Sequence, residues 1–159
     1  MQKDVPIKND IEKAVEEYAD MIFRVCIVIL KNEADAQDAV QETFLKYIQK
    51  APQFENRQHE KAWLIKVATN HSRNVLKSKS RYSDSESERI TANEVSEESS
   101  FVLEALASLP EKYSIVIVLH YIDGYKVNEI AEMIGKTPSA VKMRLQKGRK
   151  LLEKVYREE

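Results

Sequence analysis

The chain has 159 residues, a formal net charge of −1 and a single cysteine. This length allows one ordinary domain or two small ones, and one cysteine excludes an internal disulfide and fits a reducing compartment. The polar start MQKDVPIKND is not a signal peptide, and the apolar runs are too short to cross a bilayer. We therefore expect a cytoplasmic protein with no direct membrane insertion. Glycine and proline are scarce and no strand-like alternation persists, so the sequence predicts an all-α fold.

Three helices are predicted in the first half of the chain. The first covers residues 11–29, where apolar side chains recur at steps of three and four. Asn32 is a suitable N-cap for the second helix, which Pro52 ends. The third helix is expected from about residue 60 to 79.

Residues 80–99 differ in composition from the segments on either side. They include six serines, several acids and few large apolar side chains, so they cannot bury enough surface to order themselves alone. We interpret them as a flexible acidic linker between two small helical domains, residues 1–79 and 100–159. A recognition tail is the functional alternative.

The second domain begins with a predicted helix over residues 101–108. Pro110 is placed at the first position of the next helix, which runs to Tyr121. Gly124 breaks the chain before a short helix over residues 127–134.

The last two helices are separated by a short turn with Gly135 as a C-cap candidate, which is the sequence outline of a helix-turn-helix. Thr137 can cap the final helix, with Pro138 at its first position. Val141 and Leu145 centre its buried stripe. The N-terminal half of such a helix enters the major groove of DNA, so the opposite face supplies the candidates for base edges and nearby phosphates: Ser139, Lys142, Met143, Arg144 and Lys147.

Arg149, Lys150 and Lys154 lie further along this helix, where contact with backbone phosphates is more natural. A solvated basic face is the usual meaning of such a charge run. That face normally mixes signs, whereas residues 136–152 contain no acid, so DNA binding is favoured. Gly148 inside the helix costs about 1 kcal/mol relative to alanine, which close packing against the preceding helix would explain.

A second basic segment covers residues 61–81, which carry six cations and no acid. Such asymmetry in a nearly neutral chain points to a polyanionic partner. Amides and one indole lie among the cations, a composition suited to unstacked bases of a single strand. The structural alternatives stay open, because Trp63 is also a candidate for the core and Asn70 is also a candidate for a helix end.

Three segments resemble the extracytoplasmic-function (ECF) group of sigma factors, which belong to the sigma-70 family of bacterial RNA polymerase. They are ADAQDAVQETFLKYI (34–48), AWLIKVATNHSRNVLKSKSR (62–81) and LPEKYSIVIVLHYIDGYKVNEIAEMIGKTPSAVKMRLQKGRKLLEK (109–154). Together they cover nearly the whole chain outside the linker, in the order and spacing of the family. The resemblance implies a transcription initiation factor that binds core RNA polymerase and promoter DNA and helps to open the duplex.

The resemblance also assigns roles to the two domains. The first, sigma domain 2, would bind core polymerase and read the −10 element as a single strand. The second, sigma domain 4, would read the −35 element as a duplex through the helix-turn-helix. Members of the group are commonly held inactive by an anti-sigma factor, so an anti-sigma partner is expected.

Individual residues of the first domain align with functional positions of the family. Those implied to face core polymerase are Asp38, Gln41 and Glu42, with Val40 and Phe44 packing inward. Those implied to bind the −10 element are Trp63, Asn70, Arg73 and Asn74, with Asn70 in the pocket for a flipped base. Thr69 and the Ser139-Ala140 pair depart from the family pattern, which leaves the promoter sequence open.

Three other functions compete with this one. An ordinary helix-turn-helix repressor or activator would bind duplex operators without polymerase, usually as a dimer. A protein-binding adaptor would use its helical faces alone. An enzyme is disfavoured, because the three histidines have no metal-ligand spacing, no glycine-rich phosphate loop is present and Cys26 lies in an apolar run. We therefore expect no catalytic residue, no metal and no cofactor.

Overall fold

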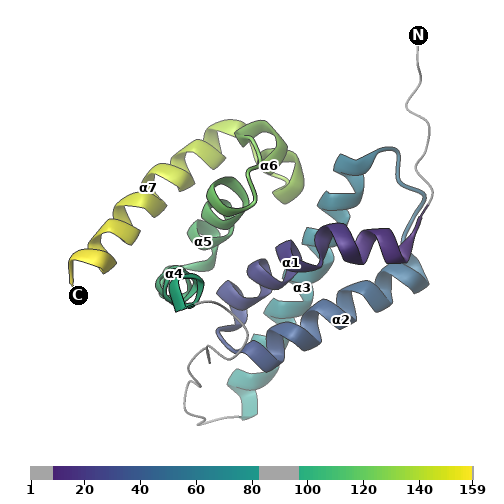
Figure 1. Ribbon diagram of the computed structural model, residues 1–159, viewed down its shortest axis with the longest axis horizontal. Coiled ribbons are helices and arrows are strands. Elements are labelled where there is room, and N and C mark those ends of the chain that lie inside the picture. The colour runs from purple at the N-terminus through teal and green to yellow at the C-terminus, as the bar shows by residue number, and fades with distance from the viewer. Residues whose placement is uncertain (1–8, 83–96, 159) are drawn as a thin grey trace.

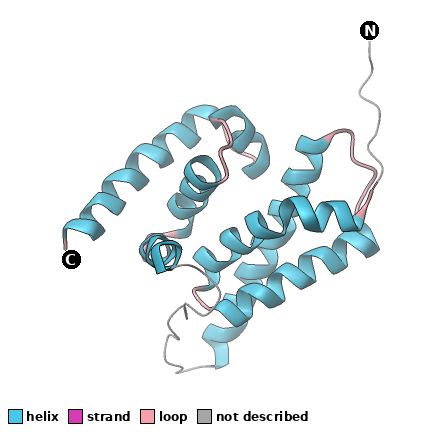
Figure 2. Ribbon diagram, viewed as in Figure 1, coloured by secondary structure: helices cyan, strands magenta, loops and turns pink. Residues whose placement is uncertain are grey.

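The computed structural model describes residues 9–82 and 97–158. Its helices form two groups that lie against each other (Figure 1). Within the described residues there is no strand (Figure 2), so the predicted all-α fold is confirmed. The first group is α1 (Ile11–Leu30), α2 (Glu33–Lys50) and α3 (Arg57–Tyr82); the second is α4 (Glu97–Ala107), α5 (Glu111–Ile117), the π-helical turn η1 (Val118–Ile122), α6 (Val127–Ile134) and α7 (Pro138–Arg157).

Two predicted helix starts are confirmed by their caps. Asn32 Oδ1 accepts a hydrogen bond from the Asp35 backbone N–H at 2.8 Å, at the start of α2. Thr137 Oγ1 accepts one from the Ala140 N–H at 3.1 Å, and Pro138 follows it at the first position of α7. Each side chain satisfies a backbone donor that the first turn of a helix leaves free.

Other predicted boundaries were wrong. α3 begins at Arg57 rather than near residue 60, because the Asn56 side chain accepts a hydrogen bond from the His59 N–H at 2.8 Å and starts the helix earlier. α3 continues to Tyr82 and α4 begins at Glu97, so both ends of the predicted linker are helical. Neither end contains the glycine or proline that would stop a helix. The rest of the linker, residues 83–96, lies outside the described residues.

The helix predicted from Pro110 to Tyr121 also differs. Pro110 is the N-cap and not the first helical residue, since its ψ of 139° is extended. The α-helix then gives way to a π-helical turn at Val118, which carries the chain to Ile122.

The second half of α1 is buried on all sides. Residues 25–30 each expose 6% or less of their surface. Six consecutive residues point in every direction around a helix, so one neighbouring layer cannot cover them all. α2 and α3 of the first group and α4 and α5 of the second group all pack against α1. The apolar run VCIVIL thereby joins the two groups in one core.

The glycine in α7 marks a close approach to α5. A Cβ atom at Gly148 would lie 2.7 Å from Ile117 Cδ1 and 3.3 Å from Tyr113 Cβ. Close packing therefore explains the glycine. The sequence suggested that its neighbour is the preceding helix, α6, but the structure shows that it is α5. α7 packs against both α5 and α6, and Gly148 lies on the side that meets α5.

We predict that Gly148→Ala lowers the free energy of unfolding by about 1 kcal/mol. Overpacking a core costs roughly 1–3 kcal/mol, which outweighs a gain in helix propensity of about 1 kcal/mol. Ile117→Val removes the Cδ1 atom but leaves the contact with Tyr113 Cβ, so Gly148→Ala should cost less in that background than in the wild type. Urea titration of the four proteins gives the coupling between the two sites. A penalty that Ile117→Val leaves unchanged would contradict the packing explanation.

Candidate nucleic-acid interface

α6 and α7 form the helix-turn-helix that the sequence predicts. Gly135 adopts the left-handed conformation, with φ at 69°, and so ends α6 in a backbone shape that glycine tolerates best. The Lys136 N–H donates to the Ala131 carbonyl at 2.9 Å and closes the turn. Val141 and Leu145 are buried, which confirms the predicted inner face of α7.

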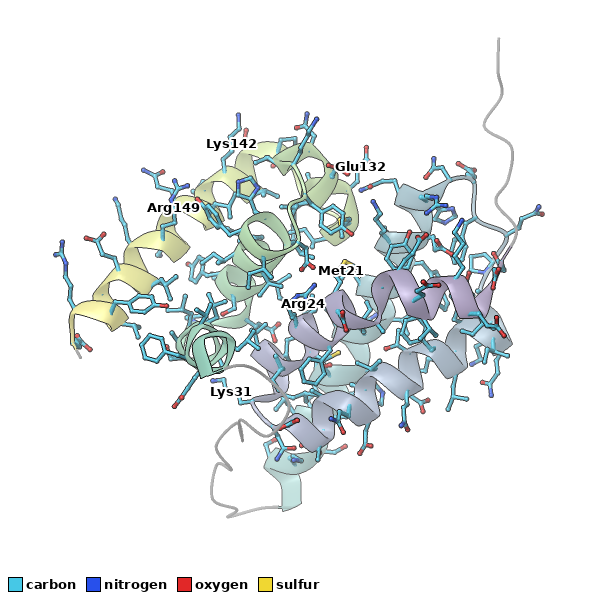
Figure 3. All side chains as sticks on the ribbon, viewed as in Figure 1. Met21, Arg24, Lys31, Glu132, Lys142 and Arg149 are labelled. Carbon is cyan, nitrogen blue, oxygen red and sulfur yellow. The ribbon has the colours of Figure 1, made fainter. Side chains whose placement is uncertain are left out.

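The opposite face of α7 presents cations to solvent. Ser139, Lys142, Met143 and Lys147 are exposed, and Arg144 is half-buried. In the described ranges 9–82 and 97–158, none of the cations from position 136 to 150 forms an ion pair with a carboxylate. Figure 3 shows Lys142 and Arg149 projecting from the side of α7 that faces away from α1–α3. This face can therefore approach an extended polyanion without displacing an internal acid.

Two tyrosines before the helix-turn-helix hold cations of α7. Arg149 donates to the Tyr121 hydroxyl at 2.6 Å, and the Lys147 ammonium lies 5.6 Å from the centre of the Tyr113 ring. Hydrogen bonding to Lys147 is the main cause that lowers the pKa of Tyr113. Sequence reasoning missed both tyrosines. The sequence pattern that could have identified them is the placement of one tyrosine, an aromatic residue with a polar hydroxyl, at each end of the apolar run SIVIVLH.

α3 carries the second candidate surface. Asn70 and Asn74 are exposed, and Lys66 and Lys77 are exposed beside them. At about 100° per residue, these four side chains fall within an arc of about 80° on one face of the helix. The structure thus brings two amides and two cations together along α3, which is the combination needed to hold a strand by its phosphates and its bases.

The indole of Trp63 belongs to an aromatic cluster. It makes edge contacts with Tyr47 and Phe54, at centroid distances of 6.1 and 5.8 Å. Phe54 is fully buried, and the Tyr47 hydroxyl donates to Glu60 at 2.7 Å within the same cluster. Trp63 itself is half-buried, so it packs on the core along one side and leaves the other accessible.

Two cations of the second basic segment contact the other helix group. Arg73 Nε donates to Glu111 Oε1 at 2.6 Å, and the Lys61 ammonium lies 4.7 Å from the centre of the Tyr125 ring. Arg73 is therefore paired with an acid of α5. Asn70 and Asn74, which were predicted to bind the −10 element together with Arg73, are exposed and do not share this contact. The sequence did not predict these two contacts, because the composition of a basic segment does not indicate which distant side chains its cations will meet.

The outer face of α2 is acidic. Asp38 and Gln41 are exposed and Glu42 is half-buried, whereas Phe44 is buried and Val40 packs against the core. Asp35, one turn earlier, pairs with Lys79 of α3. The inward and outward residues of this helix therefore lie as the sequence predicted.

Comparison with known proteins assigns both helix groups. Residues 14–82 match the sigma-70 region 2 family model and residues 102–152 match the sigma-70 region 4 model. The ECF RNA polymerase sigma factor SigW of Bacillus subtilis is 30% identical, over 91% of this chain and 87% of SigW. The RNA polymerase sigma factor SigV of the same organism is 26% identical, over 96% of this chain and 94% of SigV.

Solved structures share the fold. The sigma factor RpoE of Bartonella quintana, solved with the anti-sigma factor NepR, superposes with a TM-score of 0.77 over 94% of this chain and 98% of RpoE, at 22% identity. CnrH, solved with the cytosolic domain of CnrY, gives a TM-score of 0.71 over 94% of this chain and 88% of CnrH, also at 22% identity.

The two helix groups and their family models define a protein of the sigma-70 type. Within that class the chain belongs to the ECF sigma factors of RNA polymerase, which act in transcription initiation. In the described part of the chain, no helix is long and apolar enough to pass through a membrane.

Proposed function

We propose that this sigma factor binds core RNA polymerase through the outer face of α2, reads the −10 element through α3 and the −35 element through α7, and promotes opening of the promoter. The observation that carries the proposal is the exposed, acid-free cationic face of α7 on a helix-turn-helix. An ordinary surface helix would balance these charges with acids of its own.

Duplex contact by α7 supplies register and part of the affinity. Lys142, Arg144 and Lys147 would neutralise phosphates or read base edges in the major groove, while Ser139 and Met143 lie at the end of α7 that enters it. Each neutralised phosphate releases counterions, so binding weakens steeply with salt. Tyr113 and Tyr121 restrict the side chains of Lys147 and Arg149, which lowers the entropy that these cations lose on binding.

In this proposal, α3 opens the −10 region by binding the bases and phosphates of one separated strand. Flipping a base costs a few kcal/mol, which contacts with the extruded base must offset. Asn70 offers an amide for its hydrogen-bonding edge, and Asn74 lies one turn away on the same face. Lys66 and Lys77 would follow the phosphates of the non-template strand, and Arg73 would join them once free of Glu111.

Core polymerase and an anti-sigma factor are the proposed protein partners. Asp38, Gln41 and Glu42 give α2 an accessible polar face suited to a basic surface on polymerase. Polymerase would hold the two DNA-binding surfaces at a fixed separation and so raise their effective concentration on one promoter. Membership of the ECF group supports an anti-sigma partner.

A run-off transcription assay with core polymerase tests the proposal as a whole. We expect a promoter-specific transcript only when both core polymerase and this protein are present. Tight duplex binding without polymerase, together with no transcript, would instead identify an ordinary helix-turn-helix regulator.

The first residue-level prediction concerns α7. Replacing Lys142, Arg144 and Lys147 with alanine should weaken −35 binding by the polymerase complex and reduce the slope of log K against log salt by about 1 for every phosphate that is no longer neutralised. Fluorescence anisotropy over a salt series measures both. Lys13→Ala, at an exposed position of α1, is the matched control and should leave the slope unchanged. An unchanged slope in the triple variant would place the DNA elsewhere.

The second prediction concerns Asn70. Asn70→Ala should reduce affinity of the polymerase complex for a −10 single strand by about tenfold, because a bound base loses its hydrogen-bonding partner. Stability should change by less than about 0.5 kcal/mol, since the side chain is exposed. An abasic site at the flipped position should abolish the difference between variant and wild type. A difference that survives the abasic site would show that Asn70 contacts something other than that base.

The third prediction concerns polymerase binding. Asp38→Arg should weaken association with core polymerase by about tenfold or more, because it reverses a charge at the centre of the proposed contact. Asp20→Arg, also exposed but on α1, is the control with the same charge change. Titration calorimetry with core polymerase distinguishes them, and equal affinities for the two variants would contradict the assignment of the α2 face.

A further inference from the structure

Two lysines from different helices meet at one tyrosine. Tyr113 lies in the first turn of α5, and only 7% of its surface is exposed. The Lys112 ammonium lies 5.1 Å from the centre of the Tyr113 ring, and the Lys147 ammonium of α7 lies 5.6 Å from the same centre. Both lysines are exposed to solvent. We use the name lysine pair for Lys112 and Lys147.

The tyrosine hydroxyl brings the two ammonium groups together. A hydrogen bond from Lys147, and to a smaller extent one from Lys112, lowers the pKa of Tyr113. The aromatic face also attracts both cations and so restrains their side chains. Two positive charges are therefore kept close together on a residue that is itself fixed by burial.

No carboxylate neutralises the lysine pair. Within residues 9–82 and 97–158, neither lysine forms an ion pair. Glu111, which precedes Lys112 in the chain, is instead paired with Arg73 of α3. Two like charges held together repel each other, and an anion that binds both relieves this repulsion. A phosphate suits the site, because its oxygens can accept hydrogen bonds from both ammonium groups and from the phenol hydroxyl.

The close packing of α7 on α5 produces this arrangement. Gly148 follows Lys147, and a Cβ atom at Gly148 would lie 3.3 Å from Tyr113 Cβ. The missing side chain lets the backbone of α7 approach α5 closely. Lys147 is thereby carried to the edge of the Tyr113 ring, where it meets a lysine of the other helix.

The lysine pair and Arg149 lie on opposite flanks of α7. Lys147 and Arg149 are two residues apart, which separates them by about 200° around the helix axis. Tyr121 accepts a hydrogen bond of 2.6 Å from Arg149, and Lys142 projects from the same side of α7 as Arg149 (Figure 3). The exposed side chain of Gln146 lies between the two flanks. Each flank of α7 therefore carries a cation that a tyrosine holds in place.

A helix that enters the major groove of DNA has one phosphate backbone on each flank. The groove is about 12 Å wide and an α-helix with its side chains is about 10–12 Å across, so both backbones lie within reach. We propose that Lys112 and Lys147, brought together at Tyr113, bind one backbone phosphate of the −35 duplex. Arg149, held by Tyr121, then binds the backbone of the opposite strand. This inference rests on the −35 contact proposed above for α7, and it extends that contact to α5.

Tyr113 acts as a positioning residue in this site. A lysine side chain loses conformational entropy when it binds, and holding it in place beforehand reduces that loss. The Tyr113 hydroxyl accepts hydrogen bonds from the ammonium groups and keeps its own hydrogen, which it can donate to the same phosphate. Tyr113 thus adds a third donor without adding a charge.

Neutral backbone linkages locate the phosphate. Methylphosphonate replaces one phosphate at a time on either strand of the −35 region, and fluorescence anisotropy measures the affinity of the polymerase complex for each duplex. Lys112→Ala should weaken binding to the unmodified duplex by about threefold to tenfold and lower the salt slope by up to about 1. One methylphosphonate should weaken binding of the wild type, and Lys112→Ala should cause no further loss on that duplex. Arg149→Ala should lose additivity in the same way, but at a linkage on the other strand.

Two further variants serve as controls. Tyr113→Phe keeps the ring and removes the hydroxyl, so it should weaken binding by about threefold and leave the salt slope unchanged, because no cation is lost. That loss should disappear on the methylphosphonate duplex that is coupled to Lys112. Lys13→Ala removes the same charge from an exposed position of α1 and should leave the affinity unchanged on every duplex. Helicity and melting temperature verify that each variant folds.

The outcomes separate this inference from the proposed function. No effect of Lys112→Ala, or an effect that adds to that of every methylphosphonate, overturns the phosphate site. Coupling of Lys112 and Arg149 to the same strand overturns the assignment of two strands, and a Tyr113→Phe effect that persists on the coupled duplex overturns the positioning role. If the triple alanine variant of α7 lowers the salt slope while Lys112→Ala changes nothing, only this inference is refuted. If the triple variant also leaves the slope unchanged, the proposed −35 contact is refuted with it.

Discussion

The burial of the second half of α1 is the constraint on which the rest of this structure depends. A helix that is apolar around its whole circumference needs neighbours on every side. α2 and α3 cover one side, and α4 and α5 cover the other, so the second helix group is drawn against the first. The positions of both candidate DNA surfaces follow from that arrangement.

Charge is distributed differently over these two surfaces. Within the described residues, the cations of α7 up to Lys150 form no ion pair with an acid, whereas Arg73 and Lys61 of α3 contact the second helix group. A cation at an exposed site stays available to phosphate, because its interactions with water are easily exchanged. A cation paired with a carboxylate, as Arg73 is with Glu111, must first give up that contact. The two surfaces are therefore unequally ready for a polyanion in the free chain.

Sequence reasoning found those features that depend on neighbours along the chain. The caps at Asn32 and Thr137, the turn at Gly135 and the inner stripe through Val141 and Leu145 each arise within a few residues, and the structure confirms all of them. Contacts between distant segments were harder to foresee. Gly148 was expected to approach α6 but approaches α5, because helical periodicity identifies a buried position without identifying its neighbour.

The sequence by itself determined the helices, the helix-turn-helix, the two basic segments and the sigma family, because each is encoded in local periodicity, charge or motif order. Only the tertiary structure decided that Arg24 meets Asp123, that Arg73 meets Glu111 and that Tyr121 holds Arg149. These residues are separated by 28 positions or more, and no spacing rule relates them. Their pairing depends on how whole helices pack, which the burial of α1 from both sides controls.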